Sequence, residues 1–206
     1  MKLLGQPNSI NVRKVLWTCA ELGYSPEMEH WGTKAQPTDH PDFLAVTPKG
    51  LVPVLIDGDL TLTESNTICR YLVGHAGRSE LLSPKPRERA QIEAWMDWQA
   101  TELNNSWRTA FMAIVRKDPS YAKPDAVRVS SQTWNKLMAL LDDQLGRTGA
   151  FVCGHTFTLA DIVLGLSTNR WELTPMEKPS LPSVTAWMER MSDRPGFQAH
   201  CRNDVP

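Results

Sequence analysis

Three short segments in the first part of the chain carry side chains that could bind or activate a small ligand. The first is PNSIN, residues 7–11, where Ser9 and Asn11 fall at the expected start of a helix. A helix N-terminus offers unpaired N–H groups and the positive end of the helix dipole, and both stabilise a thiolate. No cysteine lies in this segment, so a thiol acting here would belong to a ligand. The structural alternative is that Ser9 only caps the helix.

The second segment is TPKGLVPVL, residues 47–55, where Pro53 interrupts an apolar run that is typical of a strand. Proline has no N–H to give to a sheet, but the X–Pro bond is the peptide bond that adopts the cis form at low cost. A cis Pro53 would turn the backbone N–H and C=O of Val52 outward, where an extended peptide could pair with them. The structural alternative is a proline at a strand start or a sheet edge.

The third segment is TESNTICRYL, residues 63–72, where Glu64 and Ser65 come before an apolar helical stripe. An acid and a serine in this position commonly serve as the N-cap and first turn of a helix. The same groups could instead hold an amino-acid head group. Ser65 and the helix N–H groups would then bind its carboxylate, and Glu64 would bind its ammonium.

The pattern around these segments predicts a small α/β domain over residues 1–78, because short strands alternate there with helices. In chain order we expect a strand at 2–5, a helix at 11–23 that ends at Gly23, a strand at 26–31, a helical turn near 41–45, a hairpin over 52–64 and a helix over 64–77. The tight turn of the hairpin is expected at DGD, residues 57–59.

The chain then changes character and becomes helical. The segment RSELLSPKPRER, residues 78–89, holds two prolines and many charges, which predicts a linker over 79–86 with a helix start at Pro84 or Pro86. Residues 87–206 are predicted to form an all-α domain, including a helix that begins at Pro124 and stops at Gly146.

The segment FTLADIVLG, residues 157–165, contains a predicted helix start in this second domain. Thr158 and Asp161 have the spacing of a capping box, and Phe157 and Ile162 have the spacing of a hydrophobic staple. We therefore assign this segment to folding rather than to catalysis.

Composition excludes several classes of function. The chain has 206 residues and a formal net charge of −1, which does not favour nucleic acid or an anionic membrane as a partner. Its four cysteines form no CxxC pair and no Cys/His cluster, so neither a metal site nor a dithiol redox centre is predicted. No signal-peptide core is present, and no run approaches the roughly 18 apolar residues of a membrane span. We therefore expect a cytoplasmic protein.

Together these segments resemble the cytosolic glutathione S-transferases. The resemblance covers nearly the whole chain and rests on TPKGLVPVL, LTESNTICRYL, FTLADIVLG and DRPGF. Ser9 stands four residues before Arg13, a pattern similar to that of serine-type bacterial members with theta- or delta-like character. The resemblance implies a thioredoxin-like N-terminal domain followed by an all-α helical domain. It also implies glutathione as co-substrate, a small apolar electrophile as second substrate, a homodimer and no metal.

The resemblance also implies a role for each matching residue. Pro53 is expected to be the family's cis proline, and the backbone of Val52 to contact the cysteinyl part of glutathione. Glu64 and Ser65 match the pair that holds the γ-glutamyl group. Ser9 is expected to stabilise the glutathione thiolate. Asn11 is the second candidate, because some bacterial members place a working asparagine near this turn.

The residues expected to bind the glycine end of glutathione depart from the family pattern. Leu51 stands where the family often has a polar or basic residue, and its side chain cannot bind a carboxylate. His40 and Lys34 are predicted to replace it, ahead of Thr38 and Lys49. His40 could instead be an ordinary surface histidine.

In the second domain, four residues are candidates for the electrophile site: Trp107, Arg108, Phe111 and Trp171. The aromatic ones among them could equally be core residues. Two alternatives to glutathione conjugation stay open. One is glutathione-dependent peroxide reduction or disulfide exchange on the same scaffold, and the other is a non-catalytic binding protein of this fold. Detoxification, catabolism and stress response all stay open as biological roles.

Overall fold

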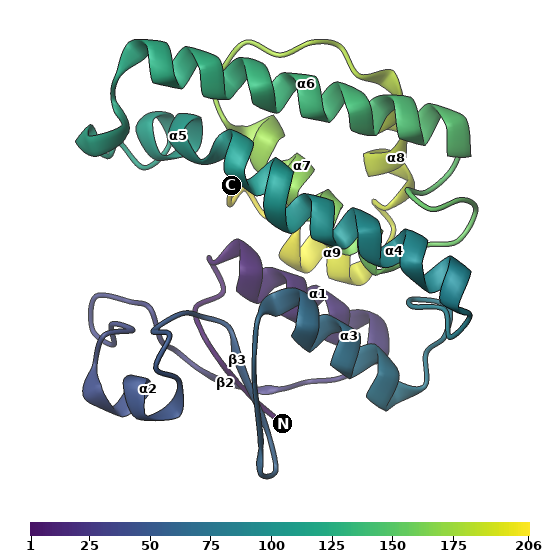
Figure 1. Cartoon of the computed structure of the whole chain (residues 1–206). Helices are drawn as coiled ribbons and strands as arrows, with labels where there is room; N and C mark the ends of the chain where they lie inside the picture. The colour runs from purple at the N-terminus through teal and green to yellow at the C-terminus, as the bar shows by residue number, and fades with distance from the viewer. The chain divides into compact units, whose positions relative to one another are not determined.

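The computed structural model describes all 206 residues, and the chain forms two compact units (Figure 1). The first comprises Met1–Leu82 together with Arg194–Asn203, and the second comprises Ser83–Asp193 together with Asp204–Pro206. The predicted domains, 1–78 and 87–206 joined by a linker at 79–86, differ from these units in one main respect. Residues 194–203 were expected in the helical domain, yet they belong to the first unit.

The first unit is built on a four-stranded mixed sheet with the order β2-β1-β3-β4. Its strands are β1 (Lys2–Leu4), β2 (Glu27–Glu29), β3 (Val54–Asp57) and β4 (Leu60–Thr63). β1 runs parallel to β2 and antiparallel to β3, and β3 and β4 form the predicted hairpin, with Asp57 opposite Leu60. This βαβ and ββα arrangement confirms the thioredoxin-like domain expected from the sequence.

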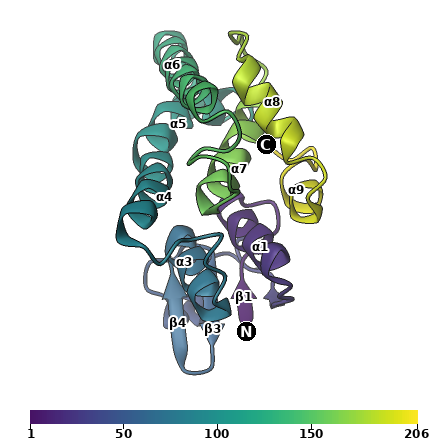
Figure 2. The ribbon, with the colours of Figure 1, turned by 90° about the vertical axis from the view of Figure 1, so that its right-hand side faces the viewer.

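The helices of this unit are α1 (Ile10–Leu22), α2 (Pro41–Val46), α3 (Ser65–Ala76) and α9 (Pro195–His200). α1 packs against α3 on one side and against α9 on another, and Figure 2 shows α1 beside each of them. Gly23 ends α1 with a φ of 72°, and its N–H bonds back to the helix. This confirms the predicted C-cap.

α9 is held on α1 by aromatic packing and by an ion pair. The rings of Trp17 and Phe197 meet edge to face with centroids 5.5 Å apart. Gly196 packs so closely on the Trp17 indole that a Cβ would not fit there. Just before α9, Arg194 donates to both carboxylate oxygens of Glu21, at 3.1 and 2.7 Å. These contacts explain why residues 194–203 join the first unit.

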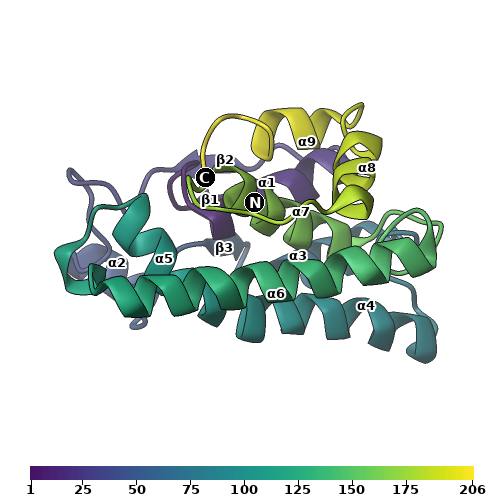
Figure 3. The ribbon, with the colours of Figure 1, turned by 90° about the horizontal axis from the view of Figure 1, so that it is seen from above.

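The second unit is helical, as predicted. Its elements are α4 (Pro86–Trp98), a π-helical turn (Gln99–Leu103), α5 (Asn104–Ile114), a short 3-10 turn (Pro119–Tyr121), α6 (Pro124–Thr148), α7 (Leu159–Leu173) and α8 (Pro182–Arg190). α6 packs against α5 and α8, and Figure 3 shows its length along this unit. None of the helices is both long and apolar enough to cross a lipid bilayer.

The predicted end of α6 at Gly146 is wrong. The helix continues to Thr148 and ends at Gly149, whose φ of 75° supplies the left-handed C-cap. Gly146 has another reason to be glycine, because a Cβ there would lie 3.3 Å from the Ser183 hydroxyl on α8. Its small size therefore permits close packing between α6 and α8.

Asp161 is the polar centre of the second unit and is fully buried. Its carboxylate accepts four hydrogen bonds, from the Thr158 N–H and hydroxyl, the Val152 N–H and the Trp187 indole N–H. Burial raises the pKa of Asp161, although these hydrogen bonds favour the ionised form. One side chain therefore ties the start of α7 to the preceding loop and to α8, in agreement with the structural role predicted for this segment.

Asp161→Asn is expected to destabilise the protein by about 2–4 kcal/mol, because the amide NH2 would face buried donors and leave at least one of them unpaired. Urea unfolding followed by circular dichroism measures the change. Asp125→Asn on the exposed surface of α6 is the control and should stay within about 0.5 kcal/mol of wild type. Equal stability of the two variants would contradict the structural role.

Candidate active site

A cavity of about 100 Å³ in the first unit gathers the three segments that the sequence marked for chemistry. They come from the first turn of α1, the chain before β3 and the start of α3. The residues that line it are Asn11, Lys49, Leu51, Val52, Pro53, Thr63, Glu64 and Ser65. Asn11 and Ser65, which are 54 residues apart in the chain, therefore meet at one place, and the family resemblance had led us to expect this convergence.

Val52 presents a free backbone edge to this cavity. The Val52–Pro53 peptide bond is cis, which confirms the prediction, and β3 begins only at Val54. Neither the N–H nor the C=O of Val52 is hydrogen-bonded within the chain. Gly5, which follows β1, leaves space here, because a Cβ on it would clash with Val12 and crowd Val52. An extended peptide could pair with this edge as a strand would.

Glu64 and Ser65 stand at the start of α3. Glu64 is the N-cap residue and has a φ of 69° and a ψ of 109°, a backbone conformation that L-residues rarely adopt. Its side chain is largely exposed and pairs with the Lys49 ammonium at 3.0 Å. Ser65 is 9% exposed, and its hydroxyl donates to the Asn11 side-chain oxygen at 3.4 Å.

Ser9 and Asn11 occupy different places at the start of α1. Ser9 is the N-cap residue, but its side chain makes no capping hydrogen bond, so the hydroxyl is available to a ligand. Ser9 is not among the residues that line the cavity, whereas Asn11 lines it and contacts Ser65. The amide of Asn11 is therefore closer to the expected γ-glutamyl end than the sequence indicated.

The structure places three of the four candidates for the glycine end, Lys49, Lys34 and His40, in different environments, and Thr38 is half-buried in the loop before α2. Lys49 lines the cavity, while Lys34 is exposed in the loop between β2 and α2. His40 caps α2 by accepting from the Asp42 N–H at 3.2 Å, and it lines a second cavity of about 470 Å³. The carboxylates of Glu29 and Asp42 line that second cavity too, and they would repel a ligand carboxylate. This favours Lys49 over His40 as the residue that would bind the glycine carboxylate of the ligand.

The aromatic candidates of the second unit are largely core. The Trp107 and Phe111 rings pack edge to face at 5.4 Å. The guanidinium of Arg170 on α7 stacks on both rings, at 4.6 and 4.2 Å from their centroids. Phe111 is 3% exposed and Arg170 is 4% exposed. Arg170 was not singled out from the sequence, because it directly follows the polar run Ser167–Asn169.

Trp171 and Arg108 lie apart from this stack. The Trp171 indole N–H donates to the Asn135 side-chain oxygen at 2.8 Å, and the Trp171 ring is 5% exposed. Arg108 is exposed. The assignment of these residues and of Trp107 and Phe111 to an electrophile site therefore stays a prediction.

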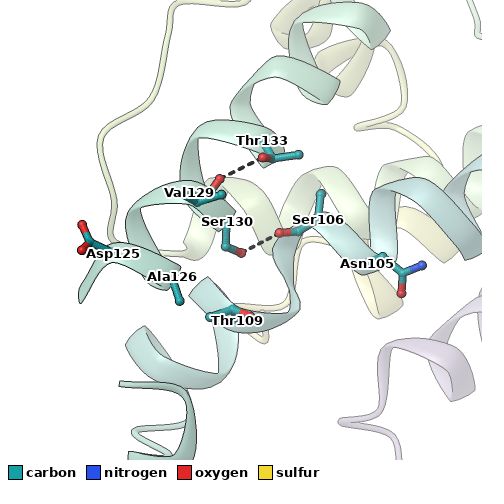
Figure 4. A pocket seen from close by; sticks show the side chains of 8 residues that line it. All are labelled: Asn105, Ser106, Thr109, Asp125, Ala126, Val129, Ser130 and Thr133. Atoms are coloured by element: carbon teal, nitrogen blue, oxygen red, sulfur yellow. Dashed lines mark hydrogen bonds between the residues drawn. The ribbon is translucent and has the colours of Figure 1, made fainter. Parts of the chain in front are cut away.

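A larger cavity of about 480 Å³ lies between α5 and α6 (Figure 4) and contains none of the predicted site residues. Small side chains line most of it. The Ser130 hydroxyl donates to the Ser106 carbonyl at 2.5 Å, and the Thr133 hydroxyl donates to the Val129 carbonyl at 2.9 Å. Because these hydroxyl protons are already used by the backbone, this groove is a poorer candidate for chemistry than the smaller cavity.

Three of the protein's four thiols are unsuited to act as nucleophiles, and the fourth, Cys201, is buried. Burial raises the pKa of Cys19 to about 12, that of Cys69 to about 11 and that of Cys153 to about 12, so these three are protonated at neutral pH. The His, Cys, Asp and Glu side chains form no group that could hold a metal ion. A reactive thiol at this site would therefore come from a ligand.

Comparison with known proteins decides the family. Residues 1–74 match the model of the glutathione S-transferase N-terminal domain, and residues 104–195 match that of the C-terminal domain. Glutathione S-transferase GstB of Escherichia coli strain K12 is 35% identical over 198 residues, which cover 95% of each chain. The chain belongs to the glutathione S-transferase family. Glutathione S-transferase 3 of Zea mays is 32% identical and aligns over 96% of this chain and 91% of that protein.

A solved structure extends the likeness to three dimensions. The theta class glutathione S-transferase of Xanthomonas axonopodis pv. citri, in its crystal structure with glutathione bound, superimposes with a TM-score of 0.91 at 32% identity. The match covers 100% of this chain and 98% of that one. These relatives confirm the predicted glutathione S-transferase resemblance and the order of an α/β domain before a helical one.

Glu64→Gly is expected to be more stable than Glu64→Ala by about 1 kcal/mol, because glycine adopts a positive φ without a Cβ clash. Both variants lose the carboxylate, so urea unfolding isolates the backbone effect. The matched pair is Thr67→Gly and Thr67→Ala, on the exposed face of α3, where alanine should be the more stable by about 1 kcal/mol. Greater stability of alanine at both positions would contradict strain at Glu64.

Proposed function

We propose that this protein is a glutathione transferase that stabilises the glutathione thiolate and joins it to a small apolar electrophile. The observation that carries the proposal is the single cavity lined by Val52, the cis Pro53, Glu64 and Ser65. A free backbone edge next to an acid and a buried hydroxyl matches a ligand that has a peptide backbone and an amino-acid head group. The family relationship supports glutathione as that ligand.

In the proposed complex, glutathione lies extended along Val52. The backbone N–H and C=O of Val52 pair with the cysteinyl residue. The γ-glutamyl carboxylate is held by Ser65 and the first N–H groups of α3, and its ammonium is held by Glu64. Lys49 lines the same cavity and pairs with Glu64 at 3.0 Å. In the proposed complex the ligand ammonium replaces Lys49 at Glu64, and Lys49 turns to the glycine carboxylate.

The sulfur of glutathione is proposed to lie at the start of α1. The free Ser9 hydroxyl donates a hydrogen bond to it, and the helix dipole favours the thiolate over the thiol. The thiolate then attacks the electrophile, a carbon–sulfur bond forms, and the leaving group departs with the displaced electron pair. Proximity and the activated nucleophile account for much of the rate.

A homodimer and a cytosolic location belong to the same proposal and rest on the family relationship. Size-exclusion chromatography with light scattering measures the mass in solution, and the chain mass is 23.2 kDa. The electrophile is proposed to bind against the helical unit, where Trp107 is the half-buried aromatic candidate.

Ser65→Ala is expected to weaken glutathione binding by roughly 1.5–3 kcal/mol, the range for a hydrogen bond to a charged group. Calorimetric titration of glutathione into wild type and variant measures the difference. Thr67→Ala, on the exposed side of the same helix, is the control and should bind like wild type. No binding by wild-type protein would contradict a glutathione site and would favour a non-catalytic member of the family.

Ser9→Ala is expected to reduce kcat for conjugation roughly 10- to 100-fold with little change in glutathione affinity, because one hydrogen bond to the thiolate is lost. Chlorodinitrobenzene serves as the probe electrophile, and reduction of a mixed glutathione disulfide is followed in parallel. Loss of rate in Asn11→Ala instead of Ser9→Ala would assign the sulfur contact to Asn11. Conjugation that survives in Ser9→Ala while disulfide reduction is lost would contradict the mechanism.

A further inference from the structure

A row of polar contacts joins α1 to α3 inside the first unit. Ser65 donates to Asn11 at 3.4 Å, the Lys14 ammonium donates to the Asn66 side-chain oxygen at 3.5 Å, and the Thr18 hydroxyl lies 3.2 Å from the Cys69 sulfur. Residues 11, 14 and 18 lie on one face of α1, since they follow helical spacing. We call this row the α1–α3 polar seam.

The seam is buried, which makes its polarity unusual for a contact between two helices. Lys14 is 1% exposed and Asn66 is 8% exposed, and Thr18 and Cys69 are fully buried. A buried ammonium costs free energy unless it is well paired, and apolar side chains of similar volume would often be at least as stable there. Stability alone therefore does not account for a lysine in this position.

One end of the seam opens into the candidate active site. Asn11 and Ser65 line the cavity. Lys14 and Asn66 do not line it, and their contact is the next one along the seam. Lys14 is one helical turn from Asn11, and Asn66 directly follows Ser65 in the first turn of α3. The Lys14–Asn66 contact thus fixes the distance between the two helix starts that form the walls of the cavity.

We propose that Lys14 is a positioning residue for glutathione, which sets the separation of Asn11 and Ser65 through Asn66 and so shapes the subsite for the γ-glutamyl carboxylate. The proposal rests on the glutathione site proposed above and adds a residue that does not itself line the cavity. Thr18 makes the next contact of the seam, one turn further from the cavity, and has no such role.

The test compares Lys14→Met with Thr18→Val, because each replaces a buried polar side chain between the same two helices with an apolar one. Calorimetric titration with glutathione should show binding weakened roughly 3- to 30-fold in Lys14→Met, the range for coupling through a packed network. Thr18→Val should bind within about twofold of wild type. Binding of γ-glutamylcysteine, which lacks the glycine, should be weakened by the same factor in Lys14→Met. The substitution is expected to disturb only the contacts of the γ-glutamyl end, which both ligands share.

Kinetics with chlorodinitrobenzene separate positioning from general damage. Lys14→Met should raise the KM for glutathione and leave kcat near the wild-type value, because binding is lost and the thiolate contact is kept. Circular dichroism and urea unfolding confirm that both variants are folded. If Lys14→Met does not fold, Asn66→Ala removes the same contact from α3 and should weaken glutathione binding in the same way.

The outcomes distinguish the two proposals. Absence of glutathione binding by wild type overturns both of them. Wild-type binding together with unchanged affinity in Lys14→Met, or in Asn66→Ala where that variant replaces it, overturns only the role of Lys14. Equal weakening by Lys14→Met and Thr18→Val also overturns that role, because any buried contact of the seam would then have the same effect.

Discussion

The burial of α1 is the constraint on which the rest of the first unit depends. This helix packs against α3 on one side and α9 on another, and it buries two basic residues, Arg13 and Lys14, along with its apolar ones. Its first turn must nevertheless stay open, because the N-terminal N–H groups are the part that can stabilise an anion. A rigidly held helix fixes Asn11 beside Ser65 at the start of α3, and it would hold the proposed sulfur contact, Ser9, at a set distance from α3.

Much of this arrangement was predictable from the sequence, because local patterns determine it. The DGD hairpin and the Gly23 cap each follow from the backbone properties of one or two residues. The X–Pro bond made a cis form at Pro53 possible, but only the family resemblance selected it over a strand-start proline. The convergence of Val52 with Glu64 and Ser65 was expected only through the family resemblance. Spacing along the chain does not itself say which segments meet.

The features that the sequence did not predict depend on long-range packing. Residues 194–203 have an ordinary helical composition, and their place on α1 follows from the fit of Gly196 to Trp17 and from the Arg194–Glu21 pair. His40 was ranked by residue type, whereas its environment is set by Glu29 and Asp42, which arrive from other elements. Lys14 was not singled out from the sequence, since no local signal shows that both sides of a helix are covered.

The contribution of residues 194–203 to the first unit has a consequence for biosynthesis. The ribosome makes β1, α1 and α3 early, but the segment that covers Trp17 emerges only after Ser83–Asp193 of the helical unit have been made. Until then, α1 exposes an apolar face that is a site for chaperone binding or aggregation. The order of translation therefore leaves the first unit, although it begins the sequence, incomplete until Ser83–Asp193 of the helical unit have been made.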